Sequence, residues 1–266
     1  MRIANTAHWV FAITMIGLGI VGLLYRGFDP VWNPVPVKFP GREVLVYLGP
    51  VISVASGIGL LVPRVVVIAT RLLFTVLLFW LLLFRSPNLL LTSLFEACWS
   101  VFPLVVMLAA AWILYVWFAT DWDRQHLSFI SGNNGLHIAH ALYGFSLIFF
   151  GSAHFIDLKD TLSLIPNWLS GHTFWAYFTG GSFIAAGVAV LAGPCAQLAA
   201  FLSALQIGLF LLLVWIPIIA GGSIVRFQWS EAILNAALLA AAWVVADSYR
   251  SASRVVAKSK QPSGIS

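Results

Sequence analysis

The stretch that decides the fold is residues 143–193, which read YGFSLIFFGSAHFIDLKDTLSLIPNWLSGHTFWAYFTGGSFIAAGVAVLAG. It contains an apolar run that ends in His154-Phe155, a polar loop around Pro166-Asn167-Trp168, and a second apolar run that is rich in glycine. Each apolar run is about as long as the roughly 20 residues that cross the hydrocarbon core of a bilayer. The stretch therefore predicts two transmembrane helices joined by a loop.

The composition extends this prediction to the whole chain. Its 266 residues are 61% hydrophobic and 9% charged, whereas a soluble domain carries roughly 25% charged residues. Apolar runs of sufficient length predict an all-α integral membrane protein with eight transmembrane helices. We expect these helices at about residues 8–25, 44–62, 65–84, 99–118, 136–155, 173–192, 195–216 and 231–248.

Residues of the first half recur in the second half at a constant offset along the sequence. This offset is the number of positions from Pro36 to Pro166, and we call it the repeat separation. The residue types that match are the informative ones in so apolar a chain, namely Pro36/Pro166, Gly41/Gly171, Tyr47/Tyr177, Gly57/Gly187, Pro87/Pro217 and Trp99/Trp229. We therefore predict two four-helix modules at residues 1–118 and 136–250, a linker at 119–135 and a basic tail at 251–266. Because four spans return the chain to the side where it started, the two modules are parallel in orientation.

The basic residues predict the orientation of the chain in the membrane. Its net charge is +5, but four of its 14 basic residues, Arg250, Arg254, Lys258 and Lys260, lie in or directly before the tail, so the charge does not indicate a nucleic-acid partner. Basic residues beside spans mark the cytoplasmic side. We expect both termini in the cytoplasm, in a bacterial cytoplasmic membrane, with the lipid bilayer as the main partner. Arg71 lies within the third span, and we expect its side chain to reach the cytoplasmic surface, where Asp247 is a possible partner.

Polar residues that occur in one half only are the candidate functional residues. His154, Asp157, Glu231 and Asn235 belong to the second half. His154 and Asp157 are three residues apart, and Glu231 and Asn235 are four apart, so each pair shares a helix face. We expect the first and last helices of the second module to be neighbours. At the repeat separation, the apolar counterparts of the four residues are Leu24, Gly27, Val101 and Val105.

Two loop residues at the same end, Trp168 and Arg226, complete the predicted ligand site. A carboxylate beside an imidazole at the membrane edge can move protons or hold a polar head group. The alternative is that these are helix-end residues solvated by loop water. A b-type haem is another alternative, held by two of His8, His137 and His140 near the inner ends of two helices. No other pattern in the sequence indicates a metal site.

Four motifs of the second half resemble the DoxX and DoxX-like family of membrane proteins: GSAHF at residues 151–155, IPNWL at 165–169, WAYFTG at 175–180 and AGVAVL at 186–191. The resemblance implies a four-helix membrane module. Some members of the family resemble the membrane subunit of a thiosulfate–quinone oxidoreductase, which implies quinone as a cofactor and a redox partner protein. This chain departs from the family in having two modules and no redox-like pair of cysteines. A small-molecule transporter and a ligand-free assembly factor remain the alternatives.

Overall fold

The computed structural model describes residues 6–25, 31–32, 40–87 and 93–259, and every regular element in these ranges is a helix. Eight helices are long and apolar enough to cross a membrane, as the apolar runs predict, so the chain is an integral membrane protein. These spans are α1 (Thr6–Leu24), α2 (Arg42–Leu61), α3 with η1 (Val66–Arg85), most of α5 (Leu94–Phe118), α8 (Asn133–Ile156), α10 (His172–Ala192), α11 with η2 and α12 (Ala196–Ala220) and most of α13 (Arg226–Ser259).

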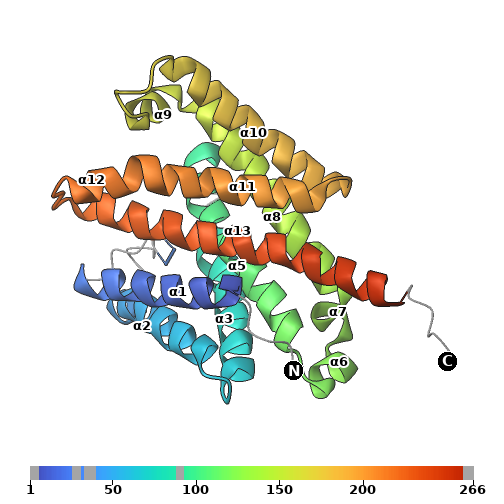
Figure 1. Ribbon diagram of the computed structural model, residues 1–266. Coiled ribbons are helices and arrows are strands. Elements are labelled where there is room, and N and C mark those ends of the chain that lie inside the picture. The colour runs from blue at the N-terminus through green and yellow to red at the C-terminus, as the bar shows by residue number, and fades with distance from the viewer. Residues whose placement is uncertain (1–5, 26–30, 33–39, 88–92, 260–266) are drawn as a thin grey trace.

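Successive spans alternate in direction, so the start of α1 and the end of α13 lie on one side of the molecule (Figure 1). On this side, which we call the linker side, α6 (Asp121–His126) and α7 (Ser128–Ser131) join α5 to α8. The short helices α9 (Leu158–Leu164) and α12 (Ile216–Ala220) lie on the opposite side, which we call the α9 side. The eight spans thus have the up-and-down topology that the sequence predicts.

Two helix starts differ from the sequence prediction because side chains cap them. The Ser93 hydroxyl accepts a hydrogen bond from the backbone N–H of Glu96, so α5 begins before the predicted start of the fourth span. Thr120 and Asp123 form a reciprocal capping box, which starts α6 inside the predicted linker. At the other end of the chain, α13 continues to Ser259, so the predicted tail begins as helix.

Two π-helical turns interrupt the third and seventh spans. The turn η1 (Leu81–Arg85) follows α3, which ends at Trp80, and η2 (Leu211–Trp215) follows α11, which ends at Phe210. Each turn ends two residues before a proline, Pro87 or Pro217. A proline lacks the N–H of a helical hydrogen bond and its ring collides with the preceding turn of a regular helix, so a wider turn accommodates it. The starts of the two turns are related by the repeat separation.

Glycines allow the first two spans of each half to approach closely. A Cβ atom on Gly57 would lie 2.7 Å from the carbonyl oxygen of Ala12, and one on Gly187 would lie 2.6 Å from the carbonyl oxygen of Gly144. Real Cβ atoms do not approach other atoms so closely, so α1 and α2, and likewise α8 and α10, pack backbone to backbone only because these positions are glycine. The small residues thus hold helices together in lipid.

The same contacts correct the alignment of the first helices. Ala12 contacts Gly57, and Gly144 contacts the corresponding Gly187, so Ala12 and Gly144 occupy corresponding places in the two halves. In the sequence, however, Ala12 and Gly144 are separated by two residues more than the repeat separation. The repeat separation therefore does not hold between α1 and α8. The prediction that His154 corresponds to Leu24 is therefore wrong, and its position corresponds to Gly22. By the same shift, His140 corresponds to His8. Pro36, from one of the matched pairs, lies outside the described residues.

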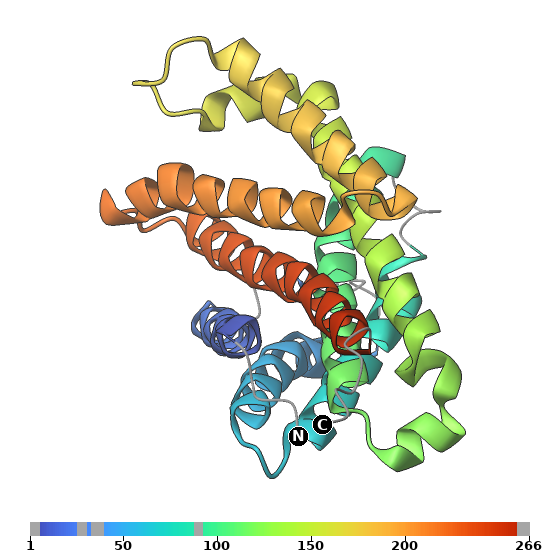
Figure 2. The ribbon, with the colours of Figure 1, turned by 45° about the vertical axis from the view of Figure 1, so that its right-hand side comes forward.

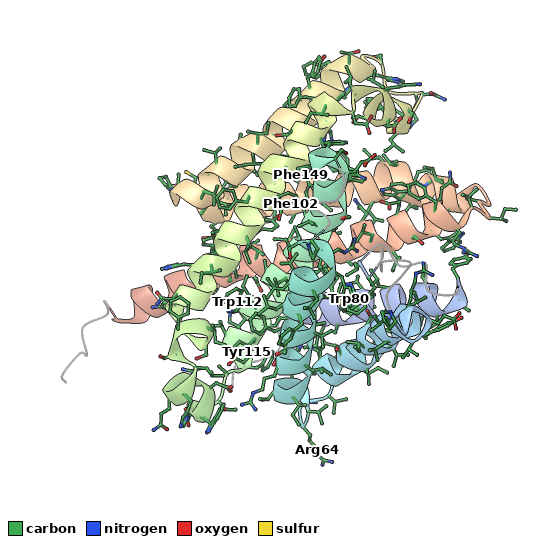
Figure 3. All side chains as sticks on the ribbon, turned by 180° about the vertical axis from the view of Figure 1, so that it is seen from behind. Arg64, Trp80, Phe102, Trp112, Tyr115 and Phe149 are labelled. Atoms are coloured by element: carbon green, nitrogen blue, oxygen red, sulfur yellow. The ribbon has the colours of Figure 1, made fainter. Side chains whose placement is uncertain are left out.

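Helices α5 and α13 lie at the centre of the molecule. α5 packs against α3, α8 and α13, and α13 packs against α1, α5 and α11. Each central helix is the last of one predicted module and packs on the first helix of the other, so the halves are not separate bundles. Figure 3 shows one such contact, where Phe102 of α5 stacks on Phe149 of α8 with ring centroids 4.6 Å apart. The prediction that α8 and α13 are neighbours holds over a short stretch only.

Candidate functional site

His154 lies in the last turn of α8 and faces other helices. Its ring centroid is 5.8 Å from that of Phe183 on α10 and 5.9 Å from that of Phe210 on α11. Its Nδ1 lies 2.7 Å from the carbonyl oxygen of Phe150. Because a carbonyl oxygen can only accept, Nδ1 carries a proton, and in the neutral imidazole Nε2 is then a hydrogen-bond acceptor. His154 thus presents one acceptor atom beside a cluster of aromatic rings.

Glu231 and Asn235 lie one turn apart on α13, and both are partly buried. The Oδ1 atom of Asn235 is buried and has no hydrogen-bond partner among the described residues. Nor does the Glu231 carboxylate form a hydrogen bond or an ion pair within the described part of the chain. An amide oxygen left buried without a partner costs about 1–3 kcal/mol. The buried Oδ1 atom of Asn235 is therefore a polar group whose burial the described residues do not compensate.

The faces of α8 and α13 that carry these residues are the faces by which the two helices meet on the linker side. There, the ring of His140 stacks on that of Tyr249 at 4.1 Å. His154 follows His140 by 14 residues on α8, and Asn235 precedes Tyr249 by 14 residues on α13. Over 14 residues a helix advances by about 21 Å and returns to within about 40° of the same face. Figures 1 and 2 show the two helices separating toward the α9 side.

This arrangement corrects the prediction that the two pairs of residues come together. Because α8 and α13 diverge, His154 forms no hydrogen bond or ion pair with Glu231 or Asn235. The three residues, which we call the acceptor residues, instead lie toward the α9-side ends of α8 and α13, and the rings beside His154 belong to α10 and α11.

The other predicted site residues lie apart from the acceptor residues. α8 ends at Ile156, and Asp157 leaves the helical conformation, so it does not share a helix face with His154 as predicted. Trp168 is 70% exposed. The guanidinium of Arg226 lies 5.6 Å from the ring centroid of Tyr25, which connects the start of α13 to the end of α1. None of the three contacts His154, Glu231 or Asn235 by an ion pair or a side-chain hydrogen bond.

The histidines considered for haem do not fit that role. The Ser248 hydroxyl donates its only hydrogen to the carbonyl oxygen of Val245, so His140 Nε2, 2.7 Å away, must donate to Ser248. This leaves Nε2 unable to bind iron. His137 is exposed, and His8 is buried with its ring 5.1 Å from that of Phe118. Within the described residues, no group of three or more His, Cys, Asp or Glu side chains has the geometry of a metal site.

The structure shows one polar network that the sequence prediction missed. Arg71 donates to the carboxylate of Asp123 at 2.7 Å, and Tyr115 and Thr120 also donate to this carboxylate. Burial alone would raise the pKa of Asp123, but the hydrogen bonds from Arg71 and Thr120 outweigh it and lower the pKa to about 2. The predicted partner of Arg71, Asp247, instead lies 3.7 Å from Arg250. The Thr120-x-x-Asp123 capping signal could have identified this network.

A second missed feature closes the α9 side of the first half. The side chain of Trp32 is 1% exposed, and its indole N–H donates to the hydroxyl of Ser53 at 2.7 Å. Trp80 donates to the carbonyl oxygen of Trp32, and the buried Arg85 donates to that of Val31. Arg85 is the last residue of η1, directly after the predicted third span, and nothing in the sequence predicts its burial. The proline-rich sequence around Trp32 carries no signal for this insertion.

Comparison with known proteins adds no family to these observations. No known protein family matches the chain, and no curated protein or solved structure matches it either.

Proposed function

We propose that the chain is the membrane subunit of a quinone-linked redox system and that it binds the quinone head group at the α9-side end of its second half. The observation that carries the proposal is the buried Oδ1 atom of Asn235, which has no hydrogen-bond partner among the described residues. A quinone is soluble in lipid and has a planar, polar head. Phe183 and Phe210 supply aromatic surface for such a ring, and the acceptor residues supply polar contacts.

The resemblance to the DoxX-like family supports the same function. We infer that the chain contains two copies of its four-helix unit, because the starts of α3 and α11 are related by the repeat separation and each helix ends in a π turn before a proline. Single π turns inside helices occur frequently at functional sites. Phe210, which contacts His154, is the residue immediately before η2. One copy would then have kept the site while the other closed it.

The orientation belongs to the same proposal. With the basic tail in the cytoplasm of a bacterium, the linker side faces inward and the α9 side faces outward. A quinone would then reach the acceptor residues near the outer surface of the membrane, where a redox partner can dock. Reporter fusions at residue 124 and at the C-terminus should both report a cytoplasmic location.

The direct test is to purify the protein from its native membranes, extract it with organic solvent and detect quinones by chromatography. We expect quinone in the parent protein and about a tenfold lower occupancy in His154→Ala, because the imidazole supplies a hydrogen-bond acceptor and ring contacts. His126→Ala is the matched control, since His126 is exposed on the linker side.

Two outcomes would contradict the proposal: the absence of quinone from the parent protein, or its undiminished retention by His154→Ala at equal membrane abundance. Substrate flux in proteoliposomes without quinone binding would instead indicate a transporter. A stable protein partner with neither activity would indicate an assembly factor.

A further inference from the structure

We propose that the linker helices α6 and α7 anchor the chain in the headgroup layer of the bilayer on the linker side, with the exposed rings of Trp122 and Phe129 inserted among the lipids. This contact goes beyond the proposed function, because it lies at the opposite end of the spans from the quinone site and does not depend on it. Three features of the linker support it: its depth, the side chains that it turns toward the protein, and its charge.

The linker folds back along the spans that it joins. The fourth span ends at Phe118 and the fifth begins at Asn133. Trp112 lies about 9 Å before the end of the fourth span along the helix axis, and its indole N–H donates to the carbonyl oxygen of Ile130 at 2.8 Å. Helix α7 packs against both α5 and α8 (Figure 1). Because the polar layers add only about 5–8 Å on each side of the hydrocarbon core, a linker held at this level lies within the headgroup layer.

The polar groups of the linker face the protein. The carboxylate of Asp123 is fully buried and accepts hydrogen bonds from Arg71 and Thr120. The Ser131 hydroxyl, which is also buried, donates to the carbonyl oxygen of Asp123 at 3.1 Å. These groups are therefore satisfied by the protein rather than by water.

The large apolar side chains of the linker face outward instead. Trp122 is 56% exposed, Leu127 38% and Phe129 60%. A buried carboxylate beside exposed apolar side chains is the reverse of what a linker in water favours. Tryptophan is enriched where a membrane meets water, because its indole has an apolar body and a polar N–H. The guanidinium of Arg71 lies 5.9 Å from the Trp122 ring centroid, so a charge that can stay near water accompanies the ring.

The charge of the linker favours contact with lipid through its rings rather than through electrostatic attraction. Residues 119–132 contain a single basic residue, Arg124, and the exposed Asp121 offsets it. Asp123 is paired with Arg71 of α3. Without an excess of positive charge, the linker has no particular attraction for anionic lipids. The anchor should therefore form equally well in a zwitterionic and in an anionic membrane.

The experiment measures how deeply single nitroxide spin labels lie when the full-length protein is reconstituted in phosphatidylcholine vesicles. A labelled cysteine is introduced by Trp122→Cys or Phe129→Cys, in a background in which Cys98→Ser and Cys195→Ser remove the two native cysteines. Collisions of each label with oxygen, which concentrates in lipid, are compared with collisions with a water-soluble nickel chelate.

Two further labels calibrate the depth. Gln125→Cys is the matched control, because Gln125 is an exposed polar residue of α6. Phe145→Cys is the reference for the hydrocarbon core, because Phe145 is 57% exposed near the middle of α8. We expect the labels at residues 122 and 129 to lie about 5–10 Å deeper than the label at residue 125. The depth should be the same when phosphatidylglycerol is added to the vesicles.

The outcomes are distinct because Trp122 and Phe129 are exposed, so both labelled proteins should unfold at the temperature of the cysteine-free background. If one of them does not, the other provides the test. A label at either position that meets the nickel chelate as often as the label at residue 125 would overturn the anchor, and the exposed rings would then be free for a protein partner. Insertion that occurs only with phosphatidylglycerol would also overturn it, because electrostatic attraction would be its cause.

Discussion

In the first half of the molecule, the chain fills its own α9-side end: Trp32 enters from a loop, donates to Ser53, and is held there by Trp80 and Arg85. In the second half, the corresponding end presents His154 beside two phenylalanines, and α13 carries the buried, unpaired Oδ1 atom of Asn235. The helices that frame the two ends share their π turns and their glycine contacts. The difference therefore lies in a few side chains and one loop. One arrangement of helices can thus be filled at its end by a side chain of the protein itself, as by Trp32, or can leave a polar atom there for another molecule, as at Asn235.

The largest expected effect comes from removing the tryptophan that closes the first half. Trp32→Ala deletes a buried indole and its hydrogen bond, and we expect a loss of about 3–5 kcal/mol in the free energy of unfolding. Free indole should restore part of the lost thermal stability, because it can refill the space. The measurement is thermal unfolding in detergent with and without indole.

Trp168→Ala is the control for this experiment, because Trp168 is 70% exposed and its removal should change the stability by no more than about 0.5 kcal/mol. Equal effects of the two substitutions would show that the two ends do not differ in the way described above.

The next largest effect tests whether the first two spans of each half pack against each other in the same way. Gly57→Ala and Gly187→Ala each place a methyl group against a backbone carbonyl oxygen, at 2.7 and 2.6 Å. We expect both to destabilise the protein by about 1–3 kcal/mol and by similar amounts. Gly181→Ala is the control, because no atom lies within 4 Å of its added Cβ. A large effect in only one of the two halves would contradict the common frame.

A smaller effect concerns the polar network that exists in the first half only. Arg71 corresponds to Phe201 in the second half, so its ion pair with Asp123 has no counterpart there. Asp123→Asn should cost about 1–2 kcal/mol, because the Asp123 side chain is fully buried while Arg71 is 39% exposed. Asp121→Asn, at an exposed neighbouring position, should have almost no effect.

The same network predicts a dependence on pH. The folded state lowers the pKa of Asp123 from its usual 3.8 to about 2, so its contribution to stability is present above pH 3.8 and is lost as the pH falls toward 2. Unfolding of the parent protein over this range should show a loss that Asp123→Asn does not show. The same loss in the variant would assign the dependence to other carboxylates.

The smallest effect on stability is expected where the proposed effect on binding is large. Asn235→Val removes a buried oxygen that has no partner among the described residues, so the unliganded protein should be unchanged or more stable by less than about 1 kcal/mol. Thermal unfolding without ligand is the measurement. A clear loss of stability would indicate that Asn235 supports the fold rather than a ligand.

The sequence predicts the spans well and the contacts between them poorly, for physical reasons. Burial of a helix in lipid requires an apolar run of fixed length, so all eight spans can be found from composition. Local caps are also visible, as Ser93 and Thr120 show. Helix pairing in lipid depends instead on close fits between small residues, and many glycines and alanines are available to make them. The shift of two residues between α1 and α8 is invisible without the contacts of Gly57 and Gly187.

The candidate site can be predicted from the sequence in part. Contrast between the halves identifies His154, Glu231 and Asn235, because an unmatched polar residue in a span needs a reason. It also selects Asp157, and Trp168 and Arg226 join it as loop residues at the same end. The structure places these three residues apart from the others. Trp32 cannot be found this way, because its importance depends on a loop entering the helices.

Each central helix packs on the first helix of the other half, and this has a consequence for how the protein is synthesised. Of the eight spans, α1 is synthesised before the others, and it packs against α13, which is synthesised after them. One face of α1 must therefore wait in the membrane, covered by lipid or by the insertion machinery, until the whole chain has been synthesised. Neither half can be finished as a unit before the other begins. A nascent chain truncated before residue 226 would lack the helix that covers α1, and quality-control proteases would encounter it as an incomplete bundle.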